Sequence, residues 1–278
     1  MRPYPVQVPP APVRRPAVAG MFYPAQPHML RNQIAGYLAA ARVPIGAEAV
    51  RAVIAPHAGY IYSGPVAGYS FRALPDLRER TIYLLGPAHF VPVRGVAAGT
   101  FQAMRTPLGE APVATDVVAE LIAAGEPLHY DDEAHAPEHS LEVEVPFLQV
   151  LGDGSFRLVP LLFGTVDPER VAAILAARLA AEATALVVVS SDLSHYYPYD
   201  TARRLDTAFL QAVVAGDVAT VGRGEACGLL PILTLMLVAK RLGWQPHLLD
   251  YRNSGDTAGD RQRVVGYGAV AYTESAGA

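Results

Sequence analysis

The chain has 278 residues, of which 51% are hydrophobic, and a formal net charge of −4, which is enough for one large α/β domain with a sizeable core. Acidic and basic residues are dispersed, so neither a nucleic-acid-binding stripe nor a basic membrane-binding helix is indicated. The single cysteine, Cys227, excludes an intrachain disulfide. Neither a signal peptide nor an apolar stretch of roughly 20 residues is visible, so a cytoplasmic protein is expected.

A proline-rich N-terminal arm followed by one domain is predicted. Residues 2–16 contain six prolines, which favours an extended arm, residues 1–16, without strand pairing of its own. Residues 17–278 show no further linker or repeat, and we expect them to form a single α/β domain.

Helical and strand-like patterns then alternate along the chain. Apolar residues recur with a helical period in residues 30–41 and 171–179. Continuous apolar runs, which are typical of strands covered on both faces, lie at residues 52–55, 82–85, 158–163 and 186–189. Two later runs, at residues 247–251 and 264–272, suit antiparallel strands added to the sheet. The pattern predicts a three-layer α/β/α fold with a mixed central sheet.

Three of the predicted strands lead directly into polar clusters. His57 follows the first strand in APHAGYIYSG (55–64), His89 follows the second in LLGPAH (84–89), and Asp192 and His195 follow the third in VVSSDLSH (188–195). A lone loop histidine is usually a surface or hydrogen-bonding residue. If these strands are parallel neighbours, however, the four side chains meet at one edge of the sheet, where α/β proteins bind ligands.

Cys227 lies in GEACGLLPILTLML (224–237), just before an apolar helical run in which Pro231 fits only the first turn. A thiol near a helix N-terminus is favoured as the thiolate, the form that binds metals. The alternative interpretation is a small, buried and inert core residue.

The segment EHSLEVEVPFLQ (138–149) predicts a helix start, with Ser140 as the N-cap and Glu142 and Glu144 in the first turn. Capping does not account for His139. We therefore treat His139 and Glu142 as candidate residues of the pocket rim, together with Tyr60 and Tyr62, for which core packing is the alternative.

Several well-known catalytic motifs are absent. The chain has no GxxxxGK[ST] loop, no GxGxxG after a strand, no GxSxG elbow and no HExxH helix. Nucleotide-dependent chemistry and the usual serine hydrolase mechanisms are therefore disfavoured.

Taken in order, the motifs resemble the Memo family, called AmmeMemoRadiSam system protein B in prokaryotes. They are AGMFYP (19–24), APHAGYIYSG, LLGPAH, EHSLEVEVPFL, SSDLSH, the CGLLPI run from Cys227, and RNSGDTAGDRQRVVGYGAVAY (252–272). The resemblance implies a fold related to class III extradiol, non-haem iron dioxygenases. It also implies that His57, His89 and Cys227 match the family's metal ligands and that Asp192 and His195 line the same pocket.

Two classes of function follow from the resemblance. The first is an oxidoreductase that binds Fe(II), with Cu(I) or Zn(II) as alternatives because a thiolate softens the site. In it His195 is the general acid/base, and Asp192 orients His195 or binds an unidentified small substrate. The second is a non-catalytic metal-binding or peptide-binding adaptor. The family name also suggests a pathway shared with AMMECR-type and radical SAM proteins, while membrane association and direct nucleic-acid binding are not expected.

Overall fold

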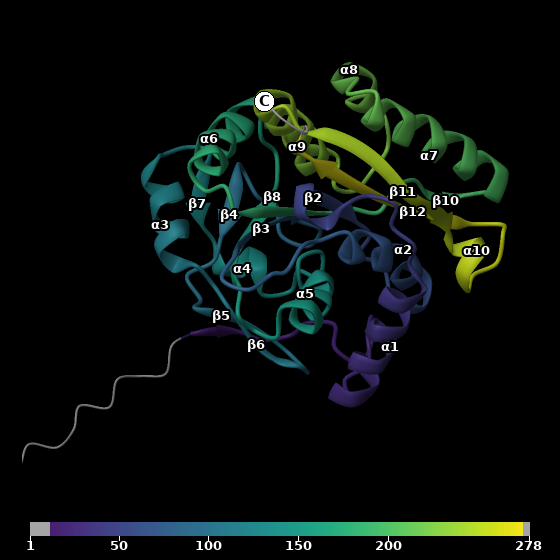
Figure 1. Cartoon of the computed structure of the whole chain (residues 1–278), viewed down its shortest axis with the longest axis horizontal. Helices are drawn as coiled ribbons and strands as arrows, with labels where there is room; N and C mark the ends of the chain where they lie inside the picture. Colours follow the sequence, from purple (N-terminus) through teal and green to yellow (C-terminus); the bar gives the residue numbers. More distant parts are fainter. Residues whose placement is uncertain (1–11, 275–278) are drawn as a thin grey trace, which may run out of the picture.

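The computed structural model describes residues 12–274, which are organised around a mixed β-sheet (Figure 1). Four neighbouring strands run parallel through its middle, in the order β2 (Val50–Ala55), β9 (Leu186–Ser190), β3 (Thr81–Pro87) and β8 (Arg157–Phe163). Every residue of β3 and β9 is buried, as continuous hydrophobic runs predict for strands covered on both faces.

Shorter or antiparallel strands extend the sheet on both sides. β12 (Val264–Thr273) is antiparallel to β2, and both β10 (His195–Tyr197) and β11 (Gln245–Asn253) pair antiparallel with β12. On the other side β4 (Val96–Ala98) is antiparallel to β8, and β7 (Leu128–Tyr130) is parallel to β4. The two late runs are thus antiparallel additions, as predicted.

Helices cover both faces of the sheet (Figure 1). On one face α6 (Pro168–Ala181) packs with α9 (Leu229–Leu242), which contacts β3 and β9; on the other, α2 (Tyr60–Arg72) packs against β2 and α1 (Pro27–Ala40). α6 begins at Asp167, whose side chain accepts a backbone N–H of the first turn. The predicted α/β architecture, a large mixed sheet flanked by helices, is confirmed.

The remaining elements are short connections or edge helices. They are η1 (Ala47–Ala49), α3 (Thr115–Ala123), α4 (Asp132–His135), η2 (Glu142–Glu144), α5 (Val145–Gly152), α7 (Tyr199–Val214), α8 (Val218–Val221) and α10 (Ser254–Thr257). Among the described helices, none has the length and hydropathy needed to cross a membrane.

The end of the predicted arm is part of the folded structure. β1 (Val13–Arg14) pairs in parallel with β5 (Ala103–Thr106), which is antiparallel to β6 (Gly109–Pro112). The expectation of an unpaired arm is therefore wrong for Val13 and Arg14, while residues 1–11 lie outside the described residues. The physical reason is that the buried Arg14 guanidinium forms an ion pair with the buried carboxylate of Glu142 and so fixes this stretch of chain.

Candidate metal centre

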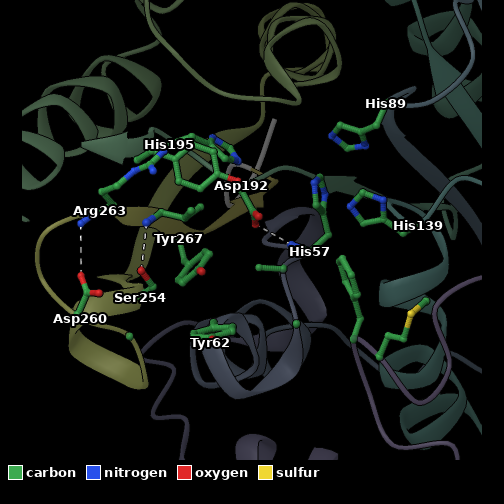
Figure 2. A pocket seen from close by; sticks show the side chains of 17 residues that line it. His57, Tyr62, His89, His139, Asp192, His195, Ser254, Asp260, Arg263 and Tyr267 are labelled. Carbon is green, nitrogen blue, oxygen red and sulfur yellow. Dashed lines mark hydrogen bonds between the residues drawn. The ribbon is translucent and has the colours of Figure 1, made fainter. Parts of the chain in front are cut away.

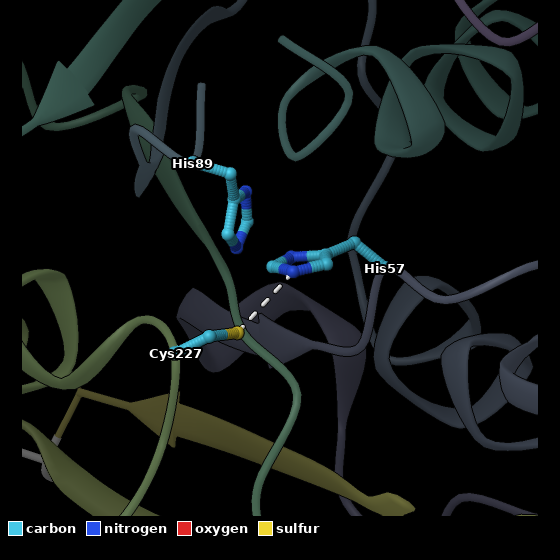
Figure 3. Close-up of side chains that lie close together, drawn as sticks. All are labelled: His57, His89 and Cys227. Atoms are coloured by element: carbon cyan, nitrogen blue, oxygen red, sulfur yellow. Dashed lines mark hydrogen bonds between the residues drawn. The ribbon is translucent and has the colours of Figure 1, made fainter. Parts of the chain in front are cut away.

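Three neighbouring parallel strands bring the predicted ligands to one edge of the sheet. β9 lies between β2 and β3, and the chain beyond the last residues of β2 and β3 carries His57 and His89. The ligand atoms of His57, His89 and Cys227 all lie within 4.8 Å of one another. His57 Nε2 is 3.3 Å from Cys227 Sγ (Figure 3). The structure therefore places two imidazoles and one thiol around a common point.

Hydrogen bonds fix which ring nitrogen of His57 faces that point. His57 Nδ1 lies 2.7 Å from Ser190 Oγ. The same hydroxyl lies 2.7 Å from the Ser140 carbonyl oxygen and 2.7 Å from Glu144 Oε1. Because the Ser190 proton is taken by one of these two oxygens, Ser190 Oγ accepts the Nδ1–H of His57. Nε2 is then unprotonated and directs its lone pair toward Cys227, as a metal ligand requires.

Glu144, the last member of this chain of hydrogen bonds, is fully buried. Burial raises the pKa of its carboxyl well above the ordinary value, which favours the neutral acid. A neutral acid can donate to Ser190 Oγ while Ser190 donates to the Ser140 carbonyl, which satisfies every partner of that hydroxyl. Glu144 Oε2 has no hydrogen-bond partner.

His89 is held in the same way by a carboxylate. Its Nδ1 lies 2.9 Å from Glu138 Oε1, and the Glu138 carboxylate also accepts the backbone N–H groups of His89, His139 and Ser140. Burial alone would raise the pKa of Glu138, but the hydrogen bonds from His89 and from the backbone hold it at about 2. Nε2 is therefore the ring nitrogen of His89 left for a metal.

A second group, His89, Glu138 and His139, also has its ligand atoms within 4.8 Å. The oxygens of Glu138 are already occupied by four N–H donors, so this group is better understood as support for His89 than as another metal site. His139 Nδ1 lies 3.3 Å from Glu138 Oε1 without the geometry of a hydrogen bond. The His139 ring stacks on His89 at 4.7 Å, and burial lowers its pKa to about 4.

The thiol of Cys227 differs from the expectation. Cys227 precedes Gly228, the N-cap of α9, but burial, followed by the nearby carboxyl of Asp192, raises the thiol pKa to about 12. The helix terminus therefore does not produce a thiolate in the metal-free chain, and a metal has to displace the proton. Gly228 allows the close approach, because a Cβ there would lie 2.6 Å from Ser191 Cβ.

Asp192 and His195 line a pocket of about 790 Å³ beside the three candidate ligands (Figure 2). The carboxylate of Asp192 accepts the backbone N–H of His57 at 2.8 Å, and burial raises its pKa to about 7. Within residues 12–274 no hydrogen bond joins Asp192 to His195, so no contact supports the expected orienting role of Asp192, and its alternative role in substrate binding stays a prediction. Burial also lowers the pKa of His195.

Of the four candidate rim residues, His139 and Tyr62 line this pocket. Tyr60 is buried and its hydroxyl donates to the Val143 carbonyl. The carboxylate of Glu142 is turned away, toward Arg14 and the hydroxyl of Tyr23.

A helical segment starts here, with Glu142 and Glu144 in the first turn of η2 as predicted, but the predicted N-cap is wrong. Leu141, not Ser140, is the N-cap of η2, and Ser140 Oγ donates to the Pro87 carbonyl at 2.8 Å. The supporting roles of Glu138, Glu144 and Ser190 were missed. The only sequence signal for them was their presence in the same motifs as the candidate ligands.

The donor set fits the metals expected from the sequence. Two imidazole nitrogens and a thiolate suit Zn(II), Cu(I) or Fe(II), and each histidine has the buried acceptor at its other nitrogen that metal-binding histidines normally have.

Comparison with known proteins places the chain in a family. The Memo-like protein family matches residues 14–271. A MEMO1 family protein of Archaeoglobus fulgidus is 39% identical and one of Sulfolobus acidocaldarius is 36% identical, each alignment covering 94% of this chain and 99% of the relative. The chain therefore belongs to the Memo family. Among solved structures, the uncharacterized protein JW3007 of Escherichia coli K12 aligns with a TM-score of 0.47 and 16% identity over 79% of this chain and 99% of that one.

Proposed function

We propose that the chain binds one metal ion through His57, His89 and Cys227 and acts as a dioxygenase-like oxidoreductase on a small substrate. The observation that carries the proposal is the fixed orientation of both imidazoles, whose Nδ1 atoms bond to Ser190 and Glu138. Fe(II) is the expected metal, with Cu(I) and Zn(II) as alternatives.

The other residues around the pocket fit such a reaction. Bound Fe(II) would supply oxygen activation beside a chelating substrate, as the resemblance to extradiol dioxygenases implies. His195 faces the pocket, and its lowered pKa keeps the imidazole neutral at pH 7, so that it can accept a proton from the substrate. Asp192 holds the backbone of His57. The site would operate in the cytoplasm, in a pathway shared with AMMECR-type and radical SAM proteins.

A non-catalytic adaptor that binds metal or peptide is the second candidate. It is favoured by the apolar side chains exposed at the pocket, with Met21 72% and Tyr196 61% exposed. Against it stands the imidazole of His195, which lies outside the group of three ligands and which a sequestering site does not need.

Metal titration of the stripped chain tests the proposal. Fe(II), Cu(I) and Zn(II) are added under anaerobic conditions, and about one ion per chain is expected. Cys227→Ser should weaken uptake, whereas His28→Ala should not, because His28 is exposed and is neither a candidate ligand nor a pocket-lining residue. Oxygen consumption of the loaded protein, screened against small chelating substrates, then separates the enzyme from the adaptor. Failure of the wild-type chain to take up any of the three metals would contradict the oxidoreductase and the metal-binding adaptor, and would leave only the peptide-binding adaptor.

A further inference from the structure

The pocket wall opposite the candidate metal centre carries a cation. Figure 2 shows Arg263 and His195 on one side of the pocket and His89 and His139 on the other. Among the described residues that line the pocket, Arg263 is the only arginine or lysine. Its charge persists at any physiological pH, unlike that of a histidine.

The guanidinium of Arg263 has no acidic partner. Within residues 12–274 it donates no hydrogen bond and makes no ion pair; only the backbone N–H of Arg263 is bonded, to Asp260 Oδ1 at 3.4 Å. That same oxygen accepts the N–H of Gln262 at 2.8 Å, so the Asp260 carboxylate is engaged in its own turn. The donors of the guanidinium remain available to a ligand.

The aromatic ring of Tyr196 holds this guanidinium in place. The Arg263 Cζ lies 5.0 Å from the centre of the Tyr196 ring, and this cation–π contact uses none of the N–H donors. The ring also meets His195 edge-on, with centroids 5.7 Å apart. Tyr196 thus connects the candidate acid/base to the free cation.

The backbone at Tyr196 is specialised for this placement. His195 pairs with Val265 and Tyr197 pairs with Val264, so Tyr196 is an extra residue in a β-bulge. Its φ of 64° is in the left-handed region that non-glycine residues rarely adopt. Bulges of this kind re-aim side chains beside functional sites, and strained residues concentrate there.

We propose that the pocket binds a small ligand whose carboxylate or phosphate is held by Arg263 and whose flat body lies among Tyr62, Tyr196 and Tyr267. The planar guanidinium matches an oxyanion with two parallel hydrogen bonds, and the three tyrosines line the pocket. A volume of about 790 Å³ accommodates such a ligand. The placement of the ligand's other end toward the metal rests on the proposed function. The anion site at Arg263 does not depend on it.

The test compares aromatic acids with a neutral analogue on the full, metal-stripped chain. Benzoate, phenyl phosphate and benzamide are titrated, and dissociation constants are measured from NMR chemical shifts. At least one of the two acids should bind about tenfold more tightly than benzamide, as a charge-assisted hydrogen bond predicts. The acid that binds more tightly identifies carboxylate or phosphate as the preferred group.

Two arginine variants locate the effect. Arg263→Gln should abolish the preference for the acid. Arg261→Gln is the matched control, since Arg261 lies over Tyr199 at 4.4 Å and does not line the pocket; it should keep the preference. Equal binding of acid and amide by the wild type, no acid binding at all, or an unchanged preference in Arg263→Gln would each overturn the inference.

The outcome is independent of the metal proposal. Arg263→Gln should take up metal as the wild-type chain does, because no ligand or supporting carboxylate is altered. Normal metal uptake without acid selectivity in the wild type would refute the anion site alone. Acid selectivity at Arg263 in a chain that takes up no metal would refute the metal proposal alone.

Discussion

The two walls of the pocket are built in different ways. The metal-side wall comes from the ends of parallel strands, supported from behind by residues 138–144. There His57, Glu138 and Glu144 are at most 2% exposed, while His89 is exposed. The opposite wall comes from the antiparallel pair β10 and β12 and the turn before β12, and Tyr196 and Arg263 there are exposed. The difference indicates that the two walls have different roles. Under the proposed function, the buried hydrogen bonds would fix the geometry of the candidate ligands before a metal binds, whereas the exposed wall would adapt to a substrate.

The largest expected contrast is between one histidine from each wall. His57→Ala removes a ligand and should lose the metal and any turnover together. His195→Ala leaves all three ligands, so metal content should stay close to that of the wild type, while turnover falls by about 10²- to 10⁴-fold if His195 is the acid/base. Metal stoichiometry and affinity of both variants check this. Equal metal loss in the two would make His195 a fourth ligand and favour the adaptor.

The buried core outside the pocket should also be sensitive to acid, through His135. Burial is the main cause that lowers the pKa of His135 to about 4, and the hydrogen bond to the Ala97 carbonyl opposes it only in part. In the unfolded chain the imidazole of His135 becomes protonated near pH 6.5. The contribution of His135 to the free energy of unfolding is therefore fully present above pH 6.5 and falls by about 3 kcal/mol as the pH is lowered to 4.

A variant isolates that contribution. His135→Gln can still donate to the Ala97 carbonyl but does not titrate, so the dependence of its unfolding free energy on pH should be flatter between pH 6.5 and 4. Denaturant unfolding at several pH values gives the slope for each protein. Parallel curves for the two would show that His135 is not buried as a neutral imidazole.

Glu144 tests whether the hydrogen bonds behind His57 set metal affinity. Glu144→Leu removes the partner of Ser190 and should weaken metal binding by about 10- to 100-fold, as for other residues that support metal ligands. Glu144→Gln keeps a neutral donor and should stay within a few-fold of the wild type. Competition titration with a chelator measures both. If Gln is as damaging as Leu, the side chain works as an ionised carboxylate instead.

Much of the fold could be predicted because long, continuous apolar runs leave few alternatives. The runs at 82–85 and 186–189 became the fully buried β3 and β9. β1, with two residues, and β4 and β7, with three each, could not be predicted. Strands this short carry no periodic signal, and they form only because a neighbouring strand is already in place.

The part of the site that could be predicted is the part whose position is determined by the ends of the strands. His57 and His89 follow strands whose parallel pairing places them together. The supporting roles of Glu138 and Glu144 were missed, because a carboxylate near a helix start looks the same in the sequence whether or not it also bonds to a distant side chain. The Glu144–Ser190 bond joins residues 46 positions apart. Likewise, no local pattern distinguishes the bulged Tyr196 from its neighbour Tyr197.

The smallest expected effect concerns that bulge and sharpens the contrast between the walls. Tyr196→Gly relieves the left-handed backbone strain, which offsets the extra entropy of glycine in the unfolded chain, so stability should change by less than about 1 kcal/mol. Tyr197→Gly, at the next position, where φ is not positive, lacks this compensation and should cost about 1 kcal/mol or more. Thermal and denaturant unfolding compare the two. Tyr196→Gly should nevertheless weaken the preference for benzoate or phenyl phosphate over benzamide, because Arg263 loses the ring that holds it. A stable variant with diminished acid selectivity would show that the strain serves the ligand rather than the fold, whereas equal destabilisation by the two glycines would show that the Tyr196 conformation carries no strain.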